Sequence, residues 1–125
     1  MIQRPDIVCA RDAAHAQAML KNHETGAHVI LLCVRPEQAE ATEQARFAEE
    51  IYRTAQSCGA ELALLFSDVP SLAAAQLIHH RRAKQVWVGK SSAGTSPFTE
   101  TIRRLVPQVS VVEHPRMPET VSVGQ

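Results

Sequence analysis

Short apolar runs alternate along the chain with longer segments in which apolar residues recur every three or four positions. The first pattern is typical of strands covered on both faces, and the second of helices that bury one face. The apolar runs predict strands at 6–10, 28–34, 61–67, 85–89 and 109–113. The periodic segments predict helices at 12–22, 37–57, 68–82 and 97–105. Strictly alternating strands and helices predict an α/β fold with a parallel, doubly wound sheet.

Residues with special backbone preferences mark the expected helix ends. Asp12, Asp68 and Ser96 stand where N-caps accept hydrogen bonds from free backbone N–H groups. Pro97 suits the first position of its helix, where the missing N–H does no harm. Gly59 suits the left-handed residue that closes the second helix.

Two of the helices show apolar stripes that we expect to face the sheet. The stripe of the second helix is Ala41, Ala45, Ala48, Tyr52 and Ala55, widened by Phe47, Ile51 and Cys58. The stripe of the third helix is Val69, Leu72, Ala73 and Leu77.

Composition indicates one globular domain without a strong charge preference. The 125 residues include 13 basic and 13 acidic side chains, so no global field favours nucleic acid or an anionic membrane. No apolar run is long enough to cross a bilayer, and we expect a cytoplasmic protein. The predicted domain spans 1–115, and 116–125 is expected to be a loose tail or linker. Cys9, Cys33 and Cys58 are expected to be reduced, buried thiols.

The segment after the fourth predicted strand has the composition of an anion-binding loop. Ligands of parallel sheets bind beyond the carboxyl ends of the strands, where Asp12 could join this loop. The helix that follows aims free N–H groups back at the loop. The candidate ligands for a nucleotide are Asp12, Gly89, Lys90, Ser91, Ser92, Thr95 and Ser96. The alternatives are a solvated loop with an ordinary N-cap and an Asp12 that only caps its helix.

Other chemistries fit the residues less well. The "GKS" at 89–91 lacks the upstream glycine of a phosphate-binding P-loop. Asp68 could be a phosphoacceptor, but no acidic pair follows the first strand to hold Mg²⁺. No histidines stand four residues apart on a helix, so we expect no metal. The basic run at 79–84 is interpreted as a solvated helix end or a docking patch. We expect no enzymatic activity from this domain alone.

Several stretches resemble the universal stress protein family. "DIVCARDAAHAQAML" is similar to the family's first strand and turn, where an aspartate contacts the nucleotide at the position of Asp12. "SDVPSLAAAQLIHHRRAKQVWVGK" is similar to its capped helix, basic turn, strand and glycine. The likeness covers nearly all of 6–114. It is closest to the universal-stress-like domain of potassium sensor histidine kinases of the KdpD type, in "ATEQARFAEEIYRTAQSCGAELALLF" and "TIRRLVPQVSVVE". The sequence departs from the ATP-binding members at Ser92, which replaces a glycine, and at the next helix start, which has none.

The resemblance implies a fold, a function and partners. The family's strand order is 3-2-1-4-5. The implied function is a cytoplasmic sensing domain of a two-component kinase, acting through ATP or another adenine nucleotide, or through docking of other universal stress proteins. The alternatives are a stand-alone universal stress protein that binds ATP and an interaction module with a degenerate site. An edge at Val109, Val111 and Val112 implies a homodimer.

Overall fold

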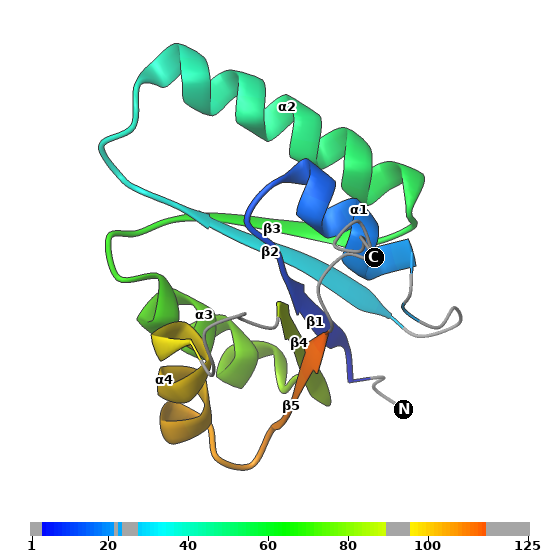
Figure 1. The fold of residues 1–125 in the computed structure, drawn as a ribbon, viewed down its shortest axis with the longest axis vertical. Coiled ribbons are helices and arrows are strands. Elements are labelled where there is room, and N and C mark those ends of the chain that lie inside the picture. Colours follow the sequence, from blue (N-terminus) through cyan, green and yellow to red (C-terminus); the bar gives the residue numbers. More distant parts are fainter. Residues whose placement is uncertain (1–3, 22, 24–27, 90–95, 115–125) are drawn as a thin grey trace, which may run out of the picture.

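The chain folds around one five-stranded parallel sheet with the order β3-β2-β1-β4-β5 (Figure 1). The computed structural model describes residues 4–21, 23, 28–89 and 96–114. The elements are β1 (Asp6–Cys9), α1 (Ala13–Lys21), β2 (Val29–Arg35), α2 (Ala41–Ser57), β3 (Glu61–Phe66), α3 (Pro70–Arg81), β4 (Gln85–Gly89), α4 (Pro97–Leu105) and β5 (Ser110–His114). The predicted fold class and strand order are confirmed. The predicted tail at 116–125 lies outside the described residues.

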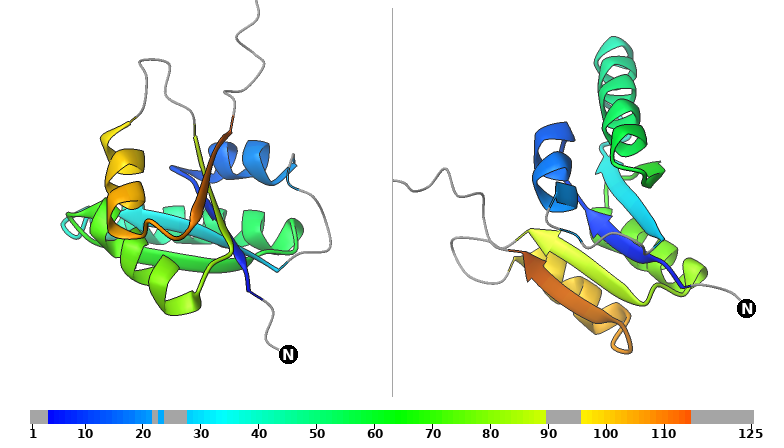
Figure 2. Two further views of the ribbon diagram at one scale, coloured as in Figure 1. Left: turned by 90° about the horizontal axis from the view of Figure 1, so that it is seen from below. Right: turned by 90° about the vertical axis from the view of Figure 1, so that its right-hand side faces the viewer.

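Helices cover both faces of the sheet, with α1 and α2 on one side and α3 and α4 on the other (Figures 1 and 2). Alternate residues of the central strand feed the two cores. Ile7 packs with Ile30, Ile78 and Ile102 on the α3 and α4 side. Val8 packs on the opposite side with a second set of buried residues, which includes Met19, Leu31 and Ile51. Both faces are therefore apolar, as the continuous runs predicted.

Strand pairing brings two carboxyl ends together. Ile7 of β1 is in register with Ile30 of β2 and with Val86 of β4. Since all these strands are parallel, the carboxyl ends of β1 and β4 lie side by side at one edge of the sheet. The helices α1 and α4 then depart to opposite faces (Figure 2). This divergence is where the sequence predicted a ligand site.

Most predicted helix ends are confirmed. Asp12 Oδ1 accepts the His15 N–H at 2.8 Å, and Ser96 Oγ accepts the Thr99 N–H at 3.1 Å. Gly59 has a φ of +72° after the C-cap of α2, a conformation that glycine adopts without strain.

The predicted cap at Asp68 is wrong. The N-cap of α3 is Val69, which makes no side-chain capping bond, and its own N–H donates to Ser67 Oγ at 3.0 Å. Asp68 Oδ1 instead accepts the Glu37 N–H at 3.2 Å, from the loop after β2. Asp68 thus connects the loop after β3 to the loop after β2, and it does not cap α3.

The second helix begins later than predicted, at Ala41 rather than at residue 37. Glu40 is its N-cap and accepts the Glu43 N–H at 2.9 Å. The carbonyl of Pro36 accepts the Gln44 Nε2–H, so the residues before the helix form a turn held by the helix itself.

The predicted buried faces of α2 and α3 are displaced around the helix axes. On α2 the predicted burial of Ile51 and Ala55 is confirmed, whereas three other members of the predicted stripe, Ala41, Ala45 and Tyr52, are exposed. On α3 the buried residues are Ala74, Ala75 and Ile78, whereas Val69 and Leu72 are exposed. The physical reason is the position of β3 at the edge of the sheet, because no further strand or helix covers the outer flanks of these helices.

The three cysteines are free and differ in environment. Cys33 is buried and Cys9 half-buried, but Cys58 is exposed, so its predicted burial is wrong. Cys58 is exposed because it is the C-cap of α2, beside the turn at Gly59. None of the helices in the described part of the chain is both long and apolar enough to span a membrane.

Candidate functional site

The candidate site lies where β1 and β4 end. Asp12 and Arg11 follow β1, and both are exposed. Besides the Asp12 cap, the Arg11 N–H donates to His15 Nδ1 at 3.1 Å. These two bonds fix the first turn of α1 against the loop, and they leave the Asp12 carboxylate at the solvent-facing edge of the sheet.

His15 connects this turn to the end of β4. A Cβ atom added to Gly89 would lie 2.8 Å from His15 Nε2 and 3.0 Å from Cε1. Any other residue at this position would force the imidazole to move. The tip of the His15 imidazole therefore occupies the space where a Cβ atom at position 89 would lie. No local pattern in the sequence indicated this role of His15, because the contact joins residues that are distant along the chain.

The loop between β4 and α4 carries most of the predicted nucleotide ligands. Lys90, Ser91, Ser92 and Thr95 lie outside the described residues, so their role stays a prediction. Ser96 is described, and its hydroxyl donates to Thr99 Oγ1 at 3.0 Å while it accepts the Thr99 N–H. The described part of this segment thus supplies the start of a capped helix.

Charged side chains gather at this carboxyl edge. Burial and, to a smaller extent, the nearby charge of Asp12 raise the pKa of Cys33 to about 12, against a lowering by Arg35. The Asp12 charge therefore acts on the end of β2 as well as on β1. The Arg35 guanidinium lies 4.2 Å from the centre of the Phe47 ring, a cation–π contact that holds it beside α2.

The buried thiols are poor nucleophiles. Burial raises the pKa of Cys9 to about 12, with a further contribution from Cys33. At neutral pH both thiols are protonated, and the thiolate is the reactive form. In the described ranges, no three His, Cys, Asp or Glu side chains are grouped so that they could hold a metal ion.

A second polar cluster, which the sequence did not predict, lies at the opposite end of the sheet. Asp6, the first residue of β1, places Oδ2 2.9 Å from His23 Nε2, and both side chains are almost fully buried. The His23 ring meets Trp87 edge-on, with 5.1 Å between ring centroids. The Trp87 indole N–H donates to Gln85 Oε1 at 2.7 Å. This cluster is enclosed by the sheet and α1, away from the candidate site.

No protein-family model and no curated protein matches the sequence. Solved structures do match in fold. The universal stress protein from Archaeoglobus fulgidus is 13% identical and superposes with a TM-score of 0.65, over 90% of this chain and 93% of that one. A universal stress protein in complex with cAMP is 15% identical, with a TM-score of 0.59 over 94% and 100%. A hypothetical protein is 13% identical, with a TM-score of 0.60 over 90% and 96%.

The protein therefore has the fold of the universal stress proteins. The likeness spans nearly the whole of both chains, and the strand order 3-2-1-4-5 agrees with it. At these identities the likeness establishes the fold alone. A closer relation to KdpD-type kinases stays a prediction from the sequence resemblance.

Proposed function

We propose that this domain is a regulatory module of the universal stress type that binds an adenine nucleotide beyond the carboxyl ends of β1 and β4. The observation that carries this proposal is the junction of Asp12, His15 and Gly89. One of its members is an exposed carboxylate, held in place by its own helix. Another is Gly89 at the end of β4, whose missing side chain leaves room for the His15 imidazole.

The chemistry of the junction suits a nucleoside. A fixed carboxylate accepts hydrogen bonds from ribose hydroxyls, and its position at the sheet edge matches where α/β folds hold nucleotides. Arg11 and the predicted Lys90 supply positive charge for phosphates. The fold neighbour in complex with cAMP supports an adenine nucleotide as the class of ligand to test first.

The finer proposal is a cytoplasmic sensing domain of the KdpD kind, without enzymatic activity of its own. It would respond to the nucleotide or to other universal stress proteins that dock on it. The sequence resemblance supports this version. Its alternative is a stand-alone universal stress protein that binds ATP, and a nucleotide-binding measurement alone does not separate these two.

A second alternative is an interaction module whose nucleotide site is degenerate. The departures at Ser92 and at the glycine-free start of α4 favour it. The predicted dimer edge would then be one of its contacts. Val111 and Val112 lie on the edge strand β5 and Val109 just before it, and all three are half-buried in the single chain.

Calorimetric titration with ATP and with cAMP tests the site. We expect saturable binding by at least one of them, weakened at least tenfold in Asp12→Asn. Asparagine keeps the N-cap but loses the charge, so the fold is unaffected. Glu49→Gln, which removes an exposed carboxylate from α2, is the matched control and should bind as the wild type does. No heat from either nucleotide at high protein concentration would overturn the proposal and favour the degenerate module.

A further inference from the structure

The outer edge of β3 is uncovered and apolar. Ser67 donates its N–H to the Arg35 carbonyl of β2 at 2.8 Å. Since backbone groups alternate along a strand, Leu62, Leu64 and Phe66 direct their N–H and C=O groups away from β2. The only charged residue of the strand is Glu61 at its start, whereas natural edges are commonly protected by central charges or proline.

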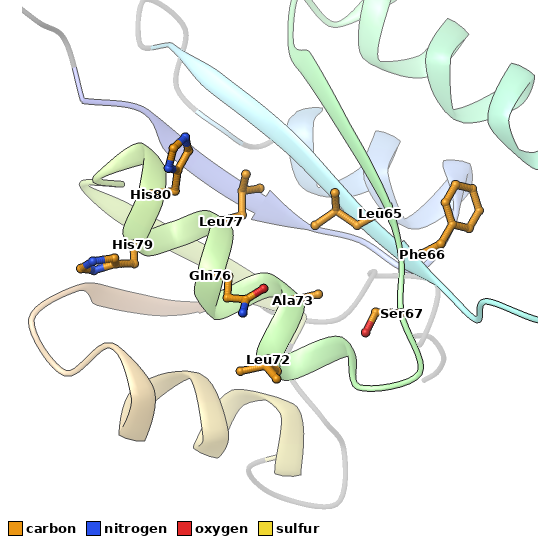
Figure 3. Close-up of a pocket in the computed structure, with 9 residues that line it drawn as sticks. All are labelled: Leu65, Phe66, Ser67, Leu72, Ala73, Gln76, Leu77, His79 and His80. Carbon is orange, nitrogen blue, oxygen red and sulfur yellow. The ribbon is translucent and has the colours of Figure 1, made fainter.

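An apolar groove lies beside this edge on the α3 side of the sheet. It has a volume of about 720 Å³, and Leu65 of β3 faces Ala73 and Leu77 of α3 across it (Figure 3). Gln76 and His80 complete this part of the groove. Leu65 and Leu77 also pack partly against the core of this face, as the sequence predicted for Leu77, and the groove is lined by the surface that they and Ala73 leave open.

A second apolar surface flanks the same edge on the α2 side. Ile51 points into the sheet, and Ala41, Ala45, Ala48 and Tyr52 lie about 60–120° further round the helix, at 3.6 residues per turn. Tyr52 is 55% exposed. Phe47 and Thr54, on the other flank, are half-buried on the side of α1. The connection from β2 through α2 to β3 is a right-handed crossover. The flank of α2 that faces away from α1, which carries the exposed stripe, therefore lies on the side of β3. Phe66 adds to it, because it points away from α3 (Figure 3) and is 47% exposed.

We propose that two copies of this chain associate through β3, with the two strands antiparallel about a two-fold axis perpendicular to the sheet. The axis would pass between the two copies of Leu64, so that Leu62 of one copy faces Phe66 of the other and Ala63 faces Leu65. Each copy would satisfy the outward backbone groups of the other, and the groove and the α2 stripe would be buried together.

Charge complementarity favours a second copy over another occupant. Carboxylates gather at the carboxyl end of β3, where Glu37, Glu40 and Asp68 outnumber Arg35. Two arginines lie at its amino end, where Arg81 pairs with Glu61 and Arg82 leaves a net positive charge. An antiparallel two-fold pairing places the acidic end of one copy against the basic end of the other at both ends of the interface. A parallel arrangement would place like charges together.

The oligomeric state in solution tests this inference, with sedimentation velocity over a concentration series. We expect the wild type to reach twice the monomer mass. Tyr52→Lys and Ala45→Lys should each weaken the dimer at least tenfold, because they place a charge in the α2 stripe at exposed positions. Thr42→Lys is the matched control, since Thr42 is exposed on the opposite, solvent side of the same helix. It should leave the dimer unchanged.

A variant of the other edge separates the two possible dimers. Val112→Lys disturbs β5, the edge at which the sequence resemblance implies a homodimer, and should leave the β3 dimer intact. A wild type that stays monomeric at hundreds of micromolar overturns the inference, including the case in which a different protein occupies the face. A dimer lost in Val112→Lys and kept in Tyr52→Lys overturns it too. Neither outcome bears on nucleotide binding, which is measured separately.

Discussion

The two ends of the sheet each hold an aspartate and a histidine, and the two pairs are built for different purposes. Asp6 and His23 at the amino end approach to 2.9 Å, with only 6% and 5% of their side chains exposed. At the carboxyl end, Asp12 is exposed and uses its carboxylate to cap α1 through the His15 N–H. The same two residue types therefore form a buried contact at the amino end and leave an exposed carboxylate at the carboxyl end.

Burial explains this difference. A carboxylate removed from water needs a partner, because an isolated buried charge is strongly unfavourable. Asp6 has His23 on one oxygen, while the other, Oδ1, makes no hydrogen bond in the described structure and lies 4.0 Å from Lys84 Nζ. Asp12 remains hydrated and keeps the capacity to exchange water for a ligand. Substitutions at the amino end should thus change the free energy of unfolding most, and substitutions at the carboxyl end should change ligand binding most.

The largest expected effect is the loss of the buried pair. Asp6→Ala leaves the enclosed His23 without its carboxylate, and we expect the free energy of unfolding to fall by about 3 kcal/mol. Chemical denaturation measures this. Lys84→Ala removes only a long contact from a mostly exposed side chain and should cost less than about 0.5 kcal/mol. A loss below about 1 kcal/mol in Asp6→Ala would show that the pair contributes little and that the two ends are alike.

The next effect tests the junction at the carboxyl end. Gly89→Ala places a methyl group 2.8 Å from His15 Nε2, and we expect a loss of about 1 kcal/mol from overpacking, because only the tip of the imidazole has to move. His15→Ala opens the space that the methyl group needs. The double variant should therefore recover most of the loss, and the double-mutant cycle gives a coupling energy of about 0.5 kcal/mol or more. Strictly additive losses would mean that His15 does not restrict Gly89.

Sequence reasoning succeeded where the signal is local and failed where it is tertiary. The alternation of apolar runs and helical periods was enough to predict the fold, and the caps at Asp12 and Ser96 depend only on the residues that follow them. Asp68 was assigned wrongly because its partner, the Glu37 N–H, comes from another loop. Periodicity found the apolar stripes but not the direction they face, since this depends on which strand forms the sheet edge. The contact between His15 and Gly89 could not be predicted, because the two residues are far apart along the chain and no local pattern connects them.

An effect of similar size separates the two roles of Asp12. Asp12→Ala removes the cap of α1, and we expect a loss of about 1 kcal/mol in the free energy of unfolding. Asp12→Asn keeps an oxygen for the His15 N–H and should lie within about 0.3 kcal/mol of the wild type. If both variants lose nucleotide binding while only the alanine variant loses stability, the charge serves the ligand and the oxygen serves the helix. Equal stability losses in the two variants would contradict this separation.

The smallest expected effect tests whether burial, or the position at one end of the sheet, makes Asp6 differ from Asp12. Glu61 also lies at the amino end, but its side chain is 42% exposed. Hydrogen bonds from Arg81, and then from His28, lower the pKa of its carboxyl group. A lowered pKa in the folded state adds stability above the ordinary value of 4.5, and this stability is lost as the pH falls below it. Because solvent screens an exposed pair, the contribution should stay below about 1 kcal/mol.

Urea unfolding of the wild type and of Glu61→Gln, at pH 7 and at pH 3, measures this contribution. We expect Glu61→Gln to be about 0.5 kcal/mol less stable at pH 7, and the difference to shrink at pH 3 as the Glu61 carboxyl group takes up protons. A difference that is undiminished at pH 3 would assign the effect to packing instead of charge. If Glu61 shows this small, pH-dependent effect while Asp6→Ala shows a large one, two carboxylates at the same end of the sheet differ through burial alone. Asp12 is then open to a ligand because it is exposed, whichever end of the strands it occupies.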